Sequence, residues 1–186
     1  MQSKSFSITV KSKIKPFKKI IKVDADKSLS IRSFLISSIS HDVSSINNIL
    51  ESEDVKSTIQ ACKKLGVKIV RFKTGSYKVF GKGLGSLLAK KNLTIDCGNS
   101  GTLARLLIGI LSTTPDIEIN ITGDKSLKKR SMKKLINLMS EFGATFLPRG
   151  KYNFPLKLIS SEMPIGIHYK SGVSAQLKSA VILAGL

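Results

Sequence analysis

The sequence predicts an α/β (α+β) fold built from repeated βαβαββ units, of which the third is truncated. A polar turn followed by an apolar helix recurs at a spacing of 72 residues, at Ser28, Ser100 and Gly172. Gly66 and Gly143, which end the expected second helices of the first two units, are 77 residues apart. A period of this length is typical of a repeated supersecondary unit rather than of a short solenoid repeat. Three such units would bring three polar helix starts together.

Composition narrows the class of protein. The 186 residues are 41% hydrophobic and 23% charged, and the net charge is +19, although only five of the 31 basic residues are Arg. Because nucleic-acid surfaces use Arg for bidentate and stacking contacts, we expect mostly solvated Lys that attracts small anions. The two cysteines fit no metal or disulfide spacing, and we expect no metal. Without an apolar leader or a run of ~18 apolar residues, a cytoplasmic location is predicted.

The first unit alternates between apolar and polar residues before its first helix. The expected elements are strands within residues 5–23, a helix at 30–40, a polar turn at 47–54, a helix from Val55 to Leu65 that ends at Gly66, and strands at 67–70 and 77–80.

The second unit repeats this order, and the third begins it. The expected elements are a strand at 93–95, a helix at 103–111, a strand at 117–121, one helix opened by residues 123–126 and ended by Gly143, a strand at 144–147, apolar stretches at 156–159 and 165–169, and a helix at 177–186. Because the third unit lacks its second helix, we expect the front part of a longer protein or a truncated reading frame.

The start of the first helix combines two cations with hydroxyl groups. Lys27, Ser28 and Arg32 lie where free backbone N–H groups and the helix dipole favour an anion, such as phosphate or carboxylate. Taken alone, the stretch is better explained as a Ser-capped helix with solvated cations. The other helix starts are needed to decide.

Small polar residues mark the next helix start. Residues 98–102 include Asn99 and Gly101, and glycine would let a ligand approach the backbone closely. A tight turn with an Asn or Ser cap is the alternative. At the third helix start, Ser174 and Gln176 add a hydroxyl and an amide that can hold hydroxyl groups or phosphate without charge.

Three successive cations, Lys128, Lys129 and Arg130, lie near the expected start of another helix. The helix dipole disfavours cations at that end. A local rule broken in this way points to an anionic ligand, and a solvated basic face is the alternative.

Taken together, these stretches resemble the N-terminal part of the 5-enolpyruvylshikimate-3-phosphate synthase family (3-phosphoshikimate 1-carboxyvinyltransferases). The matching stretches are DKSLSIR (26–32), NILESED (48–54), GNSGT (98–102) with Arg105, TGDKSL (122–127) with Arg130, and SAQLKSA (174–180). The resemblance implies two domains of three enolpyruvyl-transferase-type units each. Residues 1–22 would pair with an absent C-terminal domain, and residues 23–186 would form an incomplete N-terminal substrate-binding domain.

The implied reaction transfers the enolpyruvyl group of phosphoenolpyruvate to the 5-hydroxyl of shikimate 3-phosphate and releases phosphate, on the shikimate pathway to chorismate and aromatic amino acids. The resemblance assigns catalysis to Lys27. It assigns the binding of shikimate 3-phosphate to Lys27, Ser28, Arg32, Ser174 and Gln176. It assigns the binding of phosphoenolpyruvate to Lys27, Asn99, Gly101, Arg130 and Gln176. Gly101 would lie beside the position where glyphosate competes.

The resemblance also implies small anionic substrates as the only partners, without cofactor, nucleic acid or membrane, and a monomer when full length. The acid–base carboxylates would lie in the missing half, so this chain alone should not turn over.

The chain departs from the family pattern at three places. Asp24-Ala25 stands where Pro-Gly is usual, Ser131 where proline is common, and Ala175 where many members have serine. One alternative is the related UDP-N-acetylglucosamine enolpyruvyl transferase, which has Lys-Asn in place of Lys27-Ser28. A basic RNA-binding or RNA 3′-phosphate cyclase-like protein is another, and the scarcity of aromatic residues argues against base stacking.

Overall fold

The computed structural model describes residues 7–9, 11, 13, 15–16, 18, 20–21 and 23–186. The strands expected within residues 5–23 fall partly on residues outside this described part. The described residues of that range belong to no helix or strand. Pairing of residues 1–22 with a further domain therefore stays a prediction.

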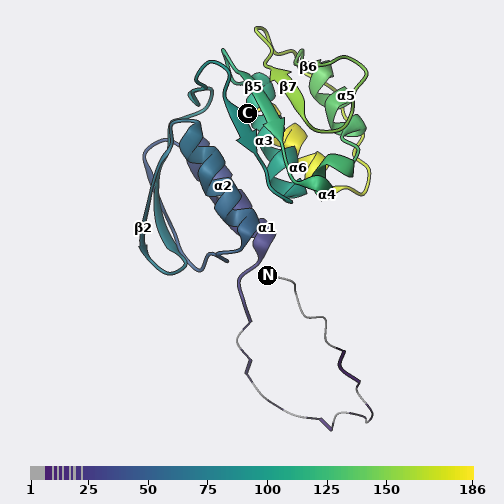
Figure 1. Ribbon diagram of the computed structural model, residues 1–186. Helices are drawn as coiled ribbons and strands as arrows, with labels where there is room; N and C mark the ends of the chain where they lie inside the picture. Colours follow the sequence, from purple (N-terminus) through teal and green to yellow (C-terminus); the bar gives the residue numbers. More distant parts are fainter. Residues whose placement is uncertain are drawn as a thin grey trace.

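The first unit is a three-stranded antiparallel sheet with two helices packed on it (Figure 1). Its elements are α1 (Lys27–Ile39), β1 (Val43–Ile46), α2 (Glu53–Lys64), β2 (Lys68–Lys73) and β3 (Ser76–Phe80), with strand order β1-β3-β2. The apolar face of α2 is buried, and Gly66 follows the helix with a φ of 86°, a value that favours glycine.

The second unit has the same internal order with one additional strand. Its elements are β4 (Thr94–Asp96), α3 (Gly101–Thr113), β5 (Glu118–Thr122), α4 (Lys125–Lys129), α5 (Lys133–Glu141), β6 (Thr145–Leu147) and β7 (Leu156–Ile159). The sheet order is β4-β5-β7-β6, so β5-β7-β6 repeats β1-β3-β2, and β4 adds a parallel strand beside β5. These two units share one element order, as predicted, and α6 (Ala175–Ala184) follows them. That α6 opens a third unit remains a prediction.

The three first helices begin at equal intervals. Their N-caps are Asp26, Ser100 and Ser174, which are 74 residues apart rather than the expected 72. In each helix the cap side chain accepts a hydrogen bond from the backbone N–H three residues later. Because Asp26 is the cap, α1 begins before the expected Ser30, and Lys27 and Ser28 lie in its first turn instead of in a preceding turn.

The structure adds to or differs from the elements expected from the sequence in three further places. The short strand β1 was not predicted from the sequence. Exposed and half-buried residues alternate along it, but two of its four residues are serines, so no alternation of apolar and polar side chains marks it. The single helix expected before Gly143 is two helices, since Arg130 adopts an extended backbone at the end of α4. Residues 165–169 form no strand.

Helix α3 is the centre of the core. Nearly all of its residues are buried, and it contacts α1, α2, α5, α6 and β7. A helix that is buried on nearly all sides depends on its neighbours for stability. At Gly109 the backbone of α6 comes so close that an added Cβ would lie 2.5 Å from the carbonyl oxygen of Ala180. This close packing fixes the start of α3 relative to the start of α6.

Candidate anion-binding site

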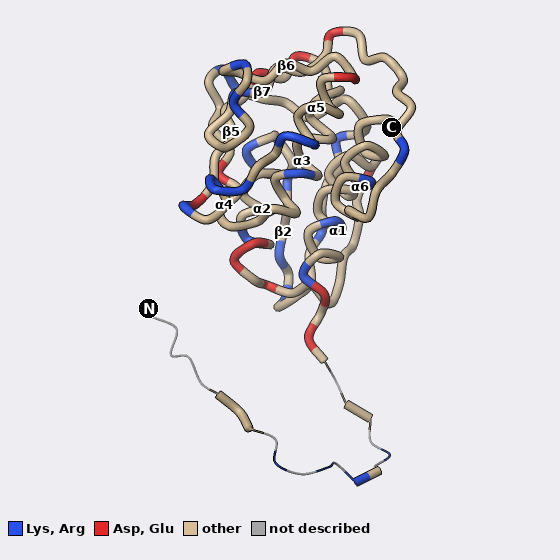
Figure 2. The backbone as a smooth tube through the Cα atoms, turned by 90° about the vertical axis from the view of Figure 1, so that its right-hand side faces the viewer, with Lys and Arg blue, Asp and Glu red and all other residues tan. Residues whose placement is uncertain are grey.

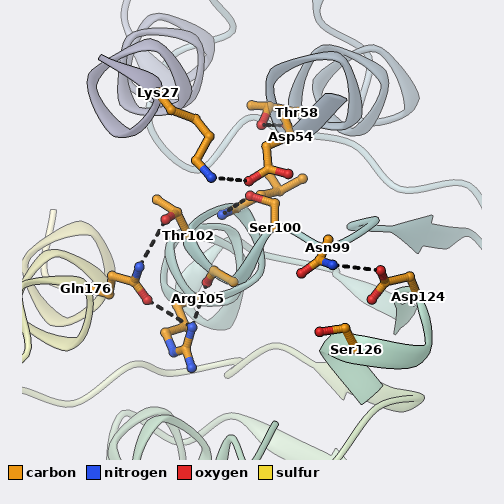
Figure 3. A network of polar contacts seen from close by, with 12 residues as sticks. Lys27, Asp54, Thr58, Asn99, Ser100, Thr102, Arg105, Asp124, Ser126 and Gln176 are labelled. Carbon is orange, nitrogen blue, oxygen red and sulfur yellow. Dashed lines mark hydrogen bonds and ion pairs between the residues drawn. The ribbon is translucent and has the colours of Figure 1, made fainter. Parts of the chain in front are cut away.

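The N-terminal ends of α1, α3 and α6 meet in one region. Figure 3 shows Lys27 of α1, Thr102 and Arg105 of α3 and Gln176 of α6 around a common space. The amide nitrogen of Gln176 donates to Thr102 Oγ1 across 3.0 Å, and Arg105 Nη1 donates to Gln176 Oε1 across 2.9 Å. The predicted convergence of the three helix starts is therefore confirmed.

Lys27 projects toward the space between α1 and α3 (Figure 3). Its Nζ is 3.0 Å from Asp54 Oδ2, and the two side chains are 50% and 18% exposed, respectively. A half-exposed ammonium at the first turn of a helix, next to other donors, is able to bind an anion that arrives from solvent.

Arg32 lies one turn further along α1 and connects that helix with α6. Its Nη1 donates to the carbonyl oxygen of Ser28, and its Nη2 donates to Ser179 Oγ, both across 3.3 Å. The two predicted ligands Ser28 and Arg32 are thus neighbours. Ser179 was within a matched stretch but had been given no role.

Asn99 and Arg130 form a second group at the start of α3. Arg130 Nη2 donates to Asn99 Oδ1 across 2.6 Å. Asn99 Nδ2 donates to Asp124 Oδ2 across 2.9 Å (Figure 3). Asp124 caps α4 by accepting from the Leu127 N–H, so one carboxylate fixes both the helix start and the Asn99 amide.

The basic run 128–130 lies at the end of a helix, not at the helix start that the sequence predicted. Lys128 and Lys129 occupy the last turn of α4, where the dipole favours cations, and Arg130 is the C-cap residue. Arg130 nevertheless reaches Asn99, because its extended backbone directs the side chain back toward the start of α3.

Gly101 is buried between two guanidinium groups. A Cβ added there would lie 2.6 Å from Arg105 Nη1 and 3.0 Å from Arg130 Nη1. Burial lowers the pKa of Arg105, and the nearby charge of Arg130 lowers it further. Two like charges held together at a helix start would be stabilised by a bound anion.

Ser174 and Gln176 lie at the start of α6, as predicted, but their polar atoms have different partners. Ser174 Oγ accepts from the Leu177 N–H across 3.4 Å as the helix cap, whereas Gln176 faces α3. A cleft of about 480 Å³ adjoins them, lined by Arg105, Ser131, Met132, Lys133, Lys134, Leu135, Ser174, Gln176 and Leu177. The cations of this lining make it suitable for an anionic group.

Sequence reasoning gave no role to Arg105, Asp54 or Asp124. Arg105 is four residues after Gly101 and so lies on the same face of α3, which was the available signal. Asp54 is in the matched stretch 48–54, and Asp124 is in the stretch 122–127. Asp54 contacts Lys27, 27 residues away in the sequence, and Asp124 contacts Asn99, 25 residues away. Contacts over such distances become visible only in the folded structure.

The rest of the positive charge is distributed over the molecule. Figure 2 shows Lys and Arg on α1, α4, β2 and the connections of the second sheet, not along one continuous stripe. In the part of the chain that the structure describes, no helix combines the length and apolar character needed to cross a membrane.

Comparison with known proteins gives consistent results. Residues 11–186 match the sequence profile of the family described as EPSP synthase (3-phosphoshikimate 1-carboxyvinyltransferase). A 3-phosphoshikimate 1-carboxyvinyltransferase of Ruegeria sp. (strain TM1040) is 39% identical over 172 residues, which cover 92% of this chain and 38% of the relative. One of Syntrophomonas wolfei is 38% identical over 178 residues, which cover 95% and 41% of the two chains.

A solved structure of EPSP synthase from Acinetobacter baumannii is also similar. Its TM-score is 0.82 at 35% sequence identity, and the match covers 89% of this chain and 37% of the other. The chain thus spans about two fifths of the length of the relatives that it matches.

Proposed function

Because the chain belongs to the EPSP synthase family, we propose that it supplies the N-terminal substrate-binding part of a 3-phosphoshikimate 1-carboxyvinyltransferase. The observation that supports the proposal most directly is the meeting of Lys27, Arg105, Arg130 and Gln176 at three helix starts. Cations and free backbone N–H groups at one place are suited to substrates that carry two phosphates and a carboxylate.

The two groups of contacts suggest two subsites. Shikimate 3-phosphate would be held by Lys27, Ser28, Arg32, Ser174 and Gln176, next to the link between α1 and α6 that Arg32 forms. Phosphoenolpyruvate would be held by Lys27, Asn99, Gly101, Arg130 and Gln176, with Arg105 as an additional cation. Lys27 and Gln176 would contact both substrates.

In the proposed reaction, the 5-hydroxyl group of shikimate 3-phosphate loses its proton as its oxygen adds to the enol carbon of phosphoenolpyruvate, and the adjacent methylene carbon gains a proton. Loss of a proton from that carbon then expels phosphate and restores the double bond. This chain would contribute by orienting the two substrates and by neutralising their negative charge. The proton-transferring carboxylates would lie in the part of the family that this chain does not span.

We therefore propose that the chain binds shikimate 3-phosphate without turning it over. Thermal unfolding with and without 1 mM shikimate 3-phosphate tests this, because a ligand at 100 times its Kd stabilises a fold by about 2.7 kcal/mol. The variants Lys27→Ala and Arg32→Ala should lose the stabilisation. Lys56→Ala, which removes an exposed cation paired with Glu53, should retain it. A folded parent chain that shows no stabilisation at millimolar ligand would contradict the proposal.

The same assay separates the two alternatives. Stabilisation by UDP-N-acetylglucosamine, or by RNA at a concentration where shikimate 3-phosphate has no effect, would favour a relative with another substrate. The scattered basic residues argue against an extended RNA surface. A cytoplasmic location and a monomeric full-length protein remain predictions.

A further inference from the structure

The stretch from Asn48 to Asp54 matches the family pattern but has no role in the proposed function. On one side it is tied to the start of α1. The hydroxyl of the buried Ser30 accepts a hydrogen bond from the Leu50 N–H across 3.0 Å and donates to the carbonyl oxygen of Asp26 across 2.7 Å. The stretch therefore keeps a fixed distance from the first turn of α1.

On its other side the stretch is tied to the turn between β2 and β3. Glu51 accepts hydrogen bonds from the Gly75 N–H at 2.8 Å, the Tyr77 hydroxyl at 2.7 Å and the Arg71 guanidinium at 2.9 and 2.7 Å. These bonds, that of Gly75 most of all, lower the pKa of Glu51 to about 2. A carboxylate with so many donors holds the stretch firmly to the hairpin.

Asp54 follows on the second residue of α2. Its carbonyl oxygen accepts from the hydroxyl of the fully buried Thr58 across 2.9 Å, which binds the start of α2 to its own second turn. Its carboxylate reaches Lys27 Nζ across 3.0 Å, and it is the less exposed partner, at 18% against 50%. The anchored group of this ion pair is the carboxylate, and the adjustable group is the lysine.

We propose that Asp54 is a positioning residue that holds the Lys27 ammonium between the starts of α1 and α3. The hydrogen bonds of Leu50 and Glu51, earlier in the same stretch, fix the backbone that carries Asp54. This inference rests on the proposed function for its ligand, but the placement of Lys27 by Asp54 is a property of the chain itself.

Loss of the Asp54 carboxylate has two effects of opposite sign on the affinity for an anion. The sign of the net change shows whether Asp54 positions Lys27 or only compensates its charge. Without Asp54, Lys27 gains rotamer freedom that an anion must remove again, which weakens binding by about 2- to 10-fold. Removal of a negative charge next to an anion site acts in the other direction and strengthens binding. Asp54→Asn should weaken binding of shikimate 3-phosphate if positioning dominates and tighten it if Asp54 is only a counter-charge.

Calorimetric titration with shikimate 3-phosphate measures that sign. Glu53→Gln is the matched control, since Glu53 is the adjacent carboxylate and pairs with Lys56 instead. In the Lys27→Ala background, Asp54→Asn should no longer weaken binding, because there is no Lys27 ammonium left to position. Unchanged or tighter binding in Asp54→Asn, or an equal loss in both backgrounds, would overturn the proposal.

A second measurement needs no ligand. A short pulse of an amine-acylating reagent, followed by mass spectrometry, should label Lys27 several-fold faster in Asp54→Asn than in the parent chain or in Glu53→Gln. An unchanged rate at Lys27 would show that Asp54 does not hold the ammonium and would overturn the proposal. Because labelling is independent of shikimate 3-phosphate, a parent that binds no ligand would refute the proposed function while this test still decides the role of Asp54.

Discussion

Arg105 on α3 donates a hydrogen bond from Nη1 to the side-chain oxygen of Gln176 on α6 across 2.9 Å. The same nitrogen donates to the carbonyl oxygen of Gly101, and the Gln176 amide nitrogen donates to Thr102. Both ends of the Gln176 amide are therefore held by α3. The orientation of Gln176 on α6 therefore depends on Arg105, a cation of the second unit.

This link predicts that Arg105→Lys weakens ligand binding although it keeps the charge. Lysine cannot reproduce the planar guanidinium that serves Gly101 and Gln176 at once. Loss of one charge-assisted hydrogen bond, worth about 1.5–3 kcal/mol, should lower the affinity for shikimate 3-phosphate about tenfold or more. Calorimetry measures the change, with Arg149→Lys at an exposed position as control. Equal affinities in the two variants would contradict the assignment.

Gly101→Ala should weaken binding of phosphoenolpyruvate while leaving the fold intact. The added methyl group would meet the ends of Arg105 and Arg130, which are flexible and can move away. Displacement of both guanidinium groups should lower affinity about tenfold, by loss of charge-assisted hydrogen bonds. Fluorescence or calorimetric titration in the presence of shikimate 3-phosphate measures this. Gly166→Ala, which has open space around it, should bind as the parent does.

Gly109→Ala should have the opposite pattern, with lower stability as the primary effect. The added Cβ would lie 2.5 Å from the backbone oxygen of Ala180 and 2.9 Å from the Cα of Ala180. The backbone of a packed helix cannot move away as the end of a flexible side chain can. Overpacking of this kind costs about 1–3 kcal/mol, partly offset by the roughly 1 kcal/mol that alanine gains over glycine in a helix. Urea unfolding measures the loss. Stability equal to that of Gly166→Ala would show that α3 and α6 are less closely packed.

Glu51 should make the stability of the chain depend on pH in the acidic range. Its pKa falls from 4.5 to about 2 in the folded chain, so the folded state binds this proton less readily than the unfolded state. The stabilisation is complete above the unfolded pKa and is lost as the pH falls toward 2. The fall in unfolding free energy between pH 5 and pH 2 should be smaller in Glu51→Gln than in the parent. Glu141→Gln, at an exposed carboxylate, should leave the slope unchanged.

The elements that the sequence predicted well are those whose signals are local. Val55 and Cys62 lie on one apolar face of α2, and Gly66 follows the helix in a conformation that favours glycine. The strands around Gly75 were likewise readable from alternation and a turn residue. These features depend on residues a few positions apart.

The break between α4 and α5 could not be predicted in this way. Leu127, Met132 and Leu135 are all buried and compatible with one continuous helix. The break is fixed by a tertiary contact, since the Met132 N–H donates to the carbonyl oxygen of Tyr152 across 2.8 Å. Periodicity reports which side chains are buried, but it does not report which backbone groups find partners outside the helix.

The site was predictable where a motif marks a helix start and not where pairs form across the fold. Lys27, Asn99 and Gln176 are at the meeting point that the repeat implied. Asp54 and Asp124 were missed because an ion pair or hydrogen bond between distant segments leaves no pattern in one sequence.

The equal spacing of the caps at Asp26, Ser100 and Ser174 has a consequence for how the sequence can diverge. In each helix the cap side chain occupies the third N–H, and helix geometry leaves the N–H groups of the two preceding residues without an intrahelical partner. These donors belong to the main chain, so a substitution that keeps the helix keeps them. Ala175, whose side chain has no polar atom, still offers its backbone N–H. Drift in side chains at these positions therefore leaves the backbone donors of all three helix starts in place.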